Sequence, residues 1–144
     1  MKLLPQNPPI DHDRVVAAIA AAERRTSGEV RVVVSRVPAP DPIKAAQAQF
    51  ERLGMTQTAA RNGVLIFLCP RSHTFAVIGD RGIHDKCGAA FWQDLAGAMS
   101  ARFRRGDFTD GLVLGIERAG ALLGEHFPRA RADQNELPDK VEEV

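Results

Sequence analysis

Residues 61–79 read RNGVLIFLCPRSHTFAVIG, and this stretch decides the fold. Residues 64–68 form a continuous apolar run, which is typical of a strand in the middle of a sheet that is covered on both faces. Residues 70–73 have the composition of a turn, and residues 74–79 return as a second strand-like run. The two runs are therefore predicted to form an antiparallel hairpin.

The chain before the hairpin predicts a helix, a strand and a second helix. Residues 13–25 place apolar side chains at helical spacing behind an acidic start, and residues 29–37 (EVRVVVSRV) are β-branched and strand-like. Asp41 then caps a helix that ends at Gly54. A right-handed crossover through this helix makes the strand at 29–37 parallel to the strand at 64–68.

Two more helices are predicted after the hairpin. The first begins at Gly88 and ends at Gly106, and the second is capped by Asp107 or Thr109 and runs to Phe127. The order helix, strand, helix, strand, strand, helix, helix predicts an α/β fold with a small mixed sheet flanked by helices on both faces. A domain at residues 10–128 is expected, with a lead at 1–9 and a polar tail at 129–144 that lacks periodicity and is expected to be disordered.

The composition excludes several classes of partner. The 144 residues include 19 Lys or Arg and 18 Asp or Glu, so the formal net charge is +1 and no strongly basic surface for nucleic acid is expected. Cys69 and Cys87 match neither a redox pair nor a metal-ligand spacing. The N-terminus lacks the apolar stretch of a signal peptide, and no run approaches the roughly 18 apolar residues of a membrane span. These features predict a cytoplasmic protein without direct membrane insertion.

The predicted topology brings polar residues to one edge of the sheet. The strands at 29–37 and 64–68 begin at the edge where the strand at 74–79 ends. Carboxylates, an amide oxygen and an imidazole should therefore converge there. Oxygen-rich clusters suit hard cations, so the sequence predicts a site for Ca²⁺ or Mg²⁺. The candidate metal ligands are Glu29, Asn62, Asp80, His84 and Asp85.

Three of these residues also have a purely structural interpretation. Glu29 is explained as a solvated strand start, Asn62 as a turn residue before Gly63, and Asp80 as a turn former. Open parallel sheets usually bind ligands at the carboxyl ends of their strands, which here is the opposite edge, near Asp41, Arg71 and His73. Both edges therefore remain candidates at this stage.

Several catalytic patterns are absent from the sequence. The residues Asp11-His12-Asp13 resemble an aspartyl-phosphate motif, but no strand precedes them and a helix follows, so helix capping explains them better. Neither cysteine has an Arg at the spacing of a cysteine-phosphatase loop. The chain contains no GxSxG, GxxxxGK[ST], GxGxxG or HExxH motif. No catalytic residue is assigned from the sequence.

Four segments in order resemble the TPM domain family, which is named for a thylakoid lumen protein, a photosystem II repair protein and a nematode modulator of acetylcholine receptors. They are TSGEVRVVV (26–34), RNGVLIFLCP (61–70), FAVIGDRGIHDKCG followed by FW (75–92), and FRRGDFTDGLVLGIERAGALLGEHFP (103–128). The positions that match named family features are Asn62 of the NG pair, the turn Gly79-Asp80 with Gly82, and Asp107. Glu29 matches the TSGE of shorter bacterial relatives.

The resemblance implies a three-layer α/β/α sandwich and two activities known in the family, which are the binding of divalent metal, notably calcium, and an acid phosphatase activity in the plant lumenal branch. Three hypotheses follow. The chain is a calcium-binding module without turnover, a metal-assisted phosphomonoesterase at the same cluster, or an interaction or quality-control domain that holds a protein partner. The first is favoured, because the sequence offers oxygen ligands and no evident nucleophile.

Overall fold

Strand β2, Val64–Cys69, lies inside the sheet and is buried at every residue. The structure is a computed structural model that describes residues 10–129 and 141–144. The four strands are ordered β3-β2-β1-β4. Burial along the whole of β2 explains its continuous apolar sequence, because a strand covered on both faces has no polar side to present.

The strands on either side of β2 have the predicted directions. β1, Val30–Val34, pairs with β2 in parallel, and β3, Thr74–Gly79, pairs with it antiparallel through the short 3₁₀ turn Pro70–Ser72. β1 is shorter than the predicted range 29–37. Beyond Val34, the Ser35 hydroxyl bonds to the backbone of Val37 and closes a local turn.

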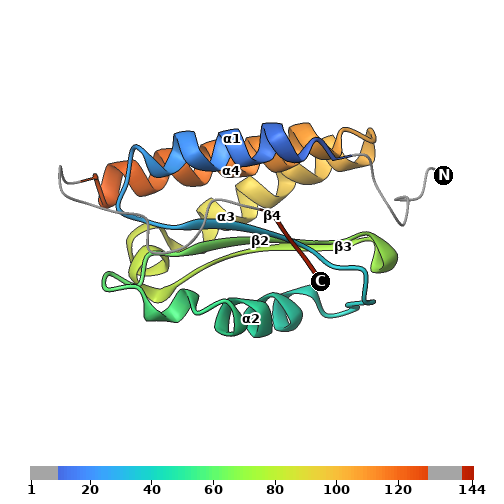
Figure 1. The fold of residues 1–144 in the computed structure, drawn as a ribbon, viewed down its shortest axis with the longest axis horizontal. Coiled ribbons are helices and arrows are strands. Elements are labelled where there is room, and N and C mark those ends of the chain that lie inside the picture. Colours follow the sequence, from blue (N-terminus) through green and yellow to red (C-terminus); the bar gives the residue numbers. More distant parts are fainter. Residues whose placement is uncertain (1–9, 130–140) are drawn as a thin grey trace.

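Helices cover both faces of the sheet, which confirms the predicted three-layer sandwich (Figure 1). The first helix α1, His12–Glu23, packs with α4, Phe108–His126, and α4 also packs against α3, Arg81–Arg104. These three helices lie on one face. Helix α2, Pro42–Arg52, covers the other face and is followed by a 3₁₀ turn at Met55–Gln57.

The core consists of two apolar clusters that alternate along β2. Val64, Ile66 and Leu68 point into the cluster under α1, α3 and α4, whereas Leu65 and Phe67 point toward α2. This alternation is the two-residue period of a strand. Filling both clusters from one strand places β2 between the two helix layers.

Helix α3 begins earlier than the sequence analysis predicts. The predicted start was Gly88, but the helix begins at Arg81, directly after Asp80, whose side chain accepts a hydrogen bond from the Arg81 amide. Gly88 instead interrupts α3 with a left-handed φ of 74°, a conformation that glycine tolerates. The glycine thus marks a break between two helical segments and not the start of the helix. The first segment begins earlier, where the carboxylate of Asp80 caps it.

The expectation of a structureless tail is wrong for its last residues. Val141–Glu143 form β4, which pairs in parallel with β1 from Val32 to Val34. The strand consists of one valine and two glutamates, so it is too short and too polar for hydrophobic periodicity to reveal it. It pairs because β1 leaves an edge to be covered and basic side chains beside that edge receive the glutamates. Residues 1–9 and 130–140, which include the whole predicted lead and most of the predicted tail, lie outside the described residues.

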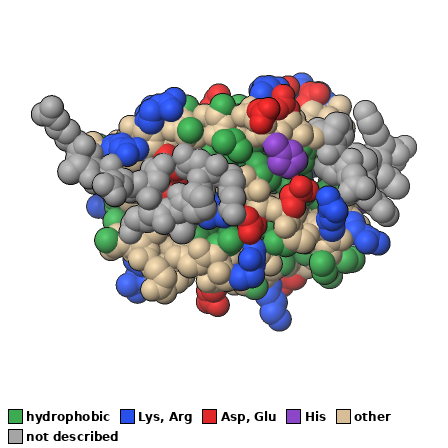
Figure 2. Space-filling view, in the orientation of Figure 1, with side chains coloured by type: hydrophobic (Ala, Val, Ile, Leu, Met, Phe, Trp, Pro, Cys, Tyr) green, Lys and Arg blue, Asp and Glu red, His purple; other side chains and the backbone are tan. Residues whose placement is uncertain are grey.

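The surface of the described residues agrees with the balanced composition. Acidic and basic side chains are interspersed on the face drawn in Figure 2, without a broad area of one sign. No helix in the described part of the chain is long and apolar enough to cross a membrane.

Gly82 allows the first turn of α3 to lie directly on the loop before β2. A Cβ at this position would lie 2.3 Å from the Ala60 carbonyl oxygen and 2.6 Å from that of Arg61. Both are backbone atoms, so Gly82→Ala forces the helix and loop apart. We expect the variant to lose about 1–3 kcal/mol of unfolding free energy, measured as a lower urea midpoint at unchanged m value.

The matched control is Gly97→Ala, in the exposed middle of α3, where a Cβ meets no atom within 4 Å. That variant should gain about 0.4–1 kcal/mol, since alanine reduces the conformational entropy of the unfolded chain. A Gly82→Ala protein as stable as the parent would contradict the proposed close contact.

Candidate functional site

The strand register places the predicted residues at one edge of the sheet. Val30 pairs with Val64, and Val64 pairs with Gly79. Glu29 and Gly63 directly precede β1 and β2, and Asp80 directly follows β3, so the three residues lie at the same end of the sheet. Two backbone hydrogen bonds continue the ladders there, from Val64 N to the Glu29 carbonyl and from Asp80 N to the Gly63 carbonyl. The shared edge inferred from the topology is therefore present.

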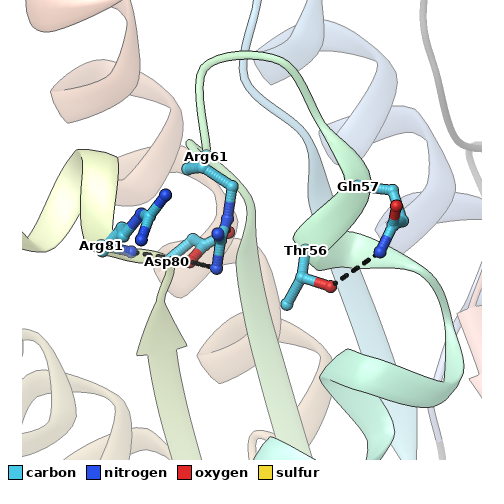
Figure 3. Close-up of polar contacts among 5 residues, drawn as sticks. All are labelled: Thr56, Gln57, Arg61, Asp80 and Arg81. Atoms are coloured by element: carbon cyan, nitrogen blue, oxygen red, sulfur yellow. Dashed lines mark hydrogen bonds and ion pairs between the residues drawn. The ribbon is translucent and has the colours of Figure 1, made fainter.

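Asp80 is the polar residue around which this edge is organised. Its carboxylate is buried and accepts two hydrogen bonds from the Arg61 guanidinium, at 2.6 Å from Nε and 2.9 Å from Nη2. It also accepts the Arg81 amide hydrogen at 2.7 Å and so caps α3. Figure 3 shows Asp80 between Arg61 and Arg81. A fork-like pair of this kind holds both partners in one orientation.

Arg61 adopts a backbone conformation that fits this role. Its φ is 52°, in the left-handed region, and its carbonyl accepts the Gly82 amide at 2.9 Å. The hydrogen bond to Asp80 raises the pKa of Arg61 above its ordinary value, so the guanidinium is charged throughout the neutral range. The Arg61–Asp80 ion pair and the hydrogen bond from Gly82 to Arg61 thus connect the loop before β2 to the start of helix α3.

The other four predicted ligands do not join Asp80. Glu29 and Asn62 are buried beneath the edge, and the Asn62 amide donates to the Ser27 hydroxyl at 3.3 Å. His84 and Asp85 are exposed on the first turns of α3. Within residues 10–129 and 141–144, no three His, Cys, Asp or Glu side chains come close enough to hold a metal ion together. The edge gathers these residues without forming the predicted cluster.

A pocket beside Asp80 contains residues that sequence analysis missed. It has a volume of about 250 Å³ and lies between α2 and the end of β3. Gln47 and Glu51 are four residues apart on α2, so they share one helix face, but nothing in the sequence says that this face overhangs the end of β3. The lining residues are Gln47, Phe50, Glu51, Thr56, Ile78, Gly79 and Asp80.

The opposite edge contains structural residues. Asp41 accepts a hydrogen bond from the Lys44 amide and caps α2, and His73 ends the 3₁₀ turn with a left-handed φ of 53°. Asp11 likewise caps α1 by accepting the Arg14 amide hydrogen. The helix cap predicted at residues 11–13 is therefore confirmed for Asp11.

Comparison with known proteins identifies the family. A family model described as the TPM domain matches residues 8–122. The chain belongs to the TPM domain family. No curated protein matches this TPM domain.

A solved structure similar to this TPM domain is the NMR structure of the BA42 protein from the psychrophilic bacterium Bizionia argentinensis. The two chains are 38% identical, and the TM-score is 0.85 over 92% of each chain. The similarity therefore extends over most of the fold. Neither comparison assigns a reaction to this TPM domain.

The cysteines of this TPM domain have the properties of unreactive thiols. Cys69 is buried, and its Sγ lies 3.2 Å from the Val37 carbonyl oxygen. Burial raises the pKa of the Cys87 thiol, which is only partly exposed. A raised pKa lowers the thiolate fraction at neutral pH, and the thiolate is the nucleophilic form.

We therefore expect Cys87 to react with a chromogenic disulfide reagent more slowly at pH 7 than an unperturbed cysteine does. The rate should rise with pH beyond the range in which a free cysteine has already ionised. Cys87→Ser should remove the reaction, since Cys69 is buried. A thiol that reacts faster than free cysteine at pH 7 would indicate a depressed pKa and reopen the cysteine as a nucleophile.

Proposed function

We propose that this TPM domain is a binding module for a divalent cation, with Ca²⁺ as the preferred ion, at the pocket between α2 and β3. One observation carries the proposal. Asp80, a ligand predicted from the sequence, lines the same small pocket as a second carboxylate, Glu51. Gln47 and Thr56 also line this pocket and carry an amide oxygen and a hydroxyl oxygen, the latter within 3.4 Å of Gln57 Nε2.

The donor set fits a hard cation. Ca²⁺ takes six to eight oxygen ligands in flexible geometry, whereas Mg²⁺ demands near-ideal octahedral geometry. Glu51 and Gln47 lie on the exposed face of α2, and Thr56 lies on the following 3₁₀ turn. Ligands from a helix, a turn and a strand end favour the more tolerant ion, with water completing its coordination.

The Arg61–Asp80 ion pair sets the expected strength of binding. Arg61 holds both oxygens of the carboxylate, so a cation at Asp80 has to compete with a guanidinium that is already in place. Two carboxylates also supply a small ligand charge. We therefore place the dissociation constant on the order of 10⁻⁴–10⁻³ M, at the weak end of protein calcium sites.

The proposal revises the ligand set predicted from the sequence. Asp80 remains the central ligand, and Glu51 replaces Glu29, which is buried beneath the sheet edge. His84 and Asp85 become exposed neighbours on α3, and Asn62 supports the edge through Ser27. Exposed Glu51 can turn toward an ion without uncovering any buried group.

A metal-assisted phosphomonoesterase is the second candidate. Arg61 and Arg81 flank Asp80 in Figure 3, and guanidinium groups can neutralise phosphoryl oxygens. The pair with Arg61 also argues against Asp80 as a nucleophile, because both carboxylate oxygens accept hydrogen bonds from it. Binding without turnover is therefore the stronger proposal.

Calcium should stabilise the native protein through this pocket. At about ten times its dissociation constant, Ca²⁺ adds about 1.4 kcal/mol to the unfolding free energy and raises the Tm by about 3–6 °C. Glu51→Gln should reduce this shift to less than half, because it removes one of two carboxylates and breaks no buried contact. Asp80→Asn should abolish it, and thermal scans of each variant with and without Ca²⁺ give the comparison.

The control is Glu117→Gln, which neutralises an exposed carboxylate on α4 and should keep the full shift. A shift that survives in both pocket variants would place the ion elsewhere in the chain. Equal loss in Glu117→Gln would reduce the effect to general screening of charge.

Substitution of Arg61 should strengthen the binding of Ca²⁺, whereas substitution of Glu51 or Asp80 should weaken it. Arg61→Gln removes the competitor for Asp80, so we expect Ca²⁺ to bind about three- to tenfold more tightly, even though the apo protein melts at a lower temperature. Isothermal titration at fixed ionic strength measures the affinity directly. Unchanged or weaker binding would show that the ion and Arg61 do not share the carboxylate.

Phosphatase activity is expected to be at most a weak, metal-dependent trace on an activated aryl phosphate. A dedicated phosphatase needs a nucleophile or a metal-activated water together with positioned cations. A turnover above about 1 s⁻¹, lost in Asp80→Asn and retained through two unrelated purification columns, would favour the enzyme over the binding module.

A further inference from the structure

β3 forms the second edge of the sheet, and its outer side carries unpaired backbone groups. In the order β3-β2-β1-β4 it has one neighbour, β2, with which it pairs antiparallel. The hydrogen bond from Asp80 N to the Gly63 carbonyl shows which residues face that neighbour. Hydrogen-bonded pairs alternate along an antiparallel ladder, so residues 74, 76 and 78 bond to β2. Phe75, Val77 and Gly79 therefore direct their N–H and C=O groups away from the sheet.

This outer side also lacks the features that protect an edge strand, which are short length, charge, proline and bulges. β3 has six residues, TFAVIG, without a charge or a proline, and its pairing with β2 contains no bulge. The outward groups of Phe75, Val77 and Gly79 have no hydrogen-bond partner within residues 10–129 and 141–144. The opposite edge differs, since β4 has three residues and two of them are glutamates. The edge of β3 is thus long, apolar and able to accept a further strand.

A second copy of β3 satisfies all of these outward groups at once. When two such strands pair antiparallel about a two-fold axis at Val77, Val77 lies opposite the partner's Val77 and Phe75 lies opposite the partner's Gly79. Each pair then exchanges two backbone hydrogen bonds. A register displaced by two residues in either direction leaves Phe75 or Gly79 opposite a residue outside the strand. The symmetric register at Val77 is therefore the one that pairs the whole edge.

The side chains that this register brings together also match. On the face toward α3, the Phe75 ring lies opposite the partner's Gly79, and an aromatic ring beside a glycine is a favourable cross-strand pair. On the face toward α2, Ala76 lies opposite the partner's Ile78, so a small side chain meets a large one. No charged residue lies between residues 75 and 79, so no like charges oppose each other. Shape and charge therefore permit the pairing that the backbone groups require.

We propose that the outer edge of β3 is a homodimer interface, in which two copies of this chain pair their β3 strands antiparallel about a two-fold axis at Val77. The two four-stranded sheets then form one continuous sheet across the axis. Backbone pairing supplies most of the binding free energy and the buried strip is narrow, so the dimer belongs to the weak, reversible class of interfaces. The proposal does not depend on the cation site, although Ile78 borders both.

Sedimentation equilibrium of the full chain tests the proposal. The average mass should rise from the 15.7 kDa of one chain toward twice that value as the concentration increases from micromolar to millimolar. Val77→Pro removes an outward N–H that β2 does not use, and an edge strand tolerates proline at such a position. The association constant of the dimer should fall at least about tenfold, because the two-fold axis removes the bond twice. Val77→Thr keeps the amide and the branched shape, so it should dimerise like the parent chain.

A second pair of variants tests the edge through charge. Ile78→Lys places two lysines beside the two-fold axis, one from each copy, and their repulsion should lower the association constant by about fivefold or more. This loss should shrink as salt is raised, since salt screens exposed charges. The matched control Ala121→Lys adds the same charge at an exposed position of α4 and should leave the association constant unchanged.

Cross-linking checks the register of the two strands. In a Cys87→Ser background, Val77→Cys should form a disulfide-linked dimer on mild oxidation, because the Cα atoms of a hydrogen-bonded pair lie about 5.5 Å apart, within disulfide reach. Phe75→Cys in the same background should not cross-link, since it faces the partner's Gly79 and lies several residues from its own counterpart.

A chain that stays monomeric at millimolar concentration would overturn the proposal and leave the edge to a strand of another protein. A dimer that both Val77→Pro and Ile78→Lys leave intact would place the interface elsewhere and overturn it as well, as would equal cross-linking at positions 75 and 77. If Val77→Pro does not fold, Ile78→Lys and its control decide the outcome.

Discussion

Burial of β2 on both faces is the constraint on which the rest of the structure depends. A strand whose six residues are all buried needs a neighbour on each side to pair its backbone and a helix layer on each face to exclude water. The crossover through α2 supplies one layer and one neighbour, and the tight turn at Pro70–Ser72 supplies the other neighbour. Helices α1, α3 and α4 then close the remaining face.

The same constraint explains why the polar edge has its composition. Where β2 begins and β3 ends, buried backbone meets solvent, and the chain has to turn into α3 within one residue. Asp80 performs this turn by capping the helix and by holding Arg61. A carboxylate with two structural duties is well oriented but is not free of partners. For the proposed cation site the expected consequence is weak binding, because an ion would gain Asp80 only as Arg61 gives it up.

Much of the fold could be predicted from the sequence, because strong periodicity and turn residues mark each element. The apolar run at 64–68, the caps at Asp11 and Asp41, and the stripe of α4 each carry a local signal. The first turns of α3, residues 81–87, were not predicted, because Gly88 was interpreted as the start of this helix although it interrupts it. β4 was missed because its pairing depends on Arg31 and Arg52, which lie about ninety or more residues away in sequence. Glu51 was missed because only the packing of α2 on β3 brings it beside Asp80.

The partners in the β1–β4 pair lie more than one hundred residues apart along the chain, and this distance gives the pairing a kinetic consequence. Non-local contacts of that span form late, because the chain entropy of so large a loop is lost before the contact stabilises anything. During synthesis every other described element precedes β4. A nascent domain would therefore present the bare edge of β1 for a time, and the charge of Arg31 at that edge would discourage pairing with another neutral, apolar strand.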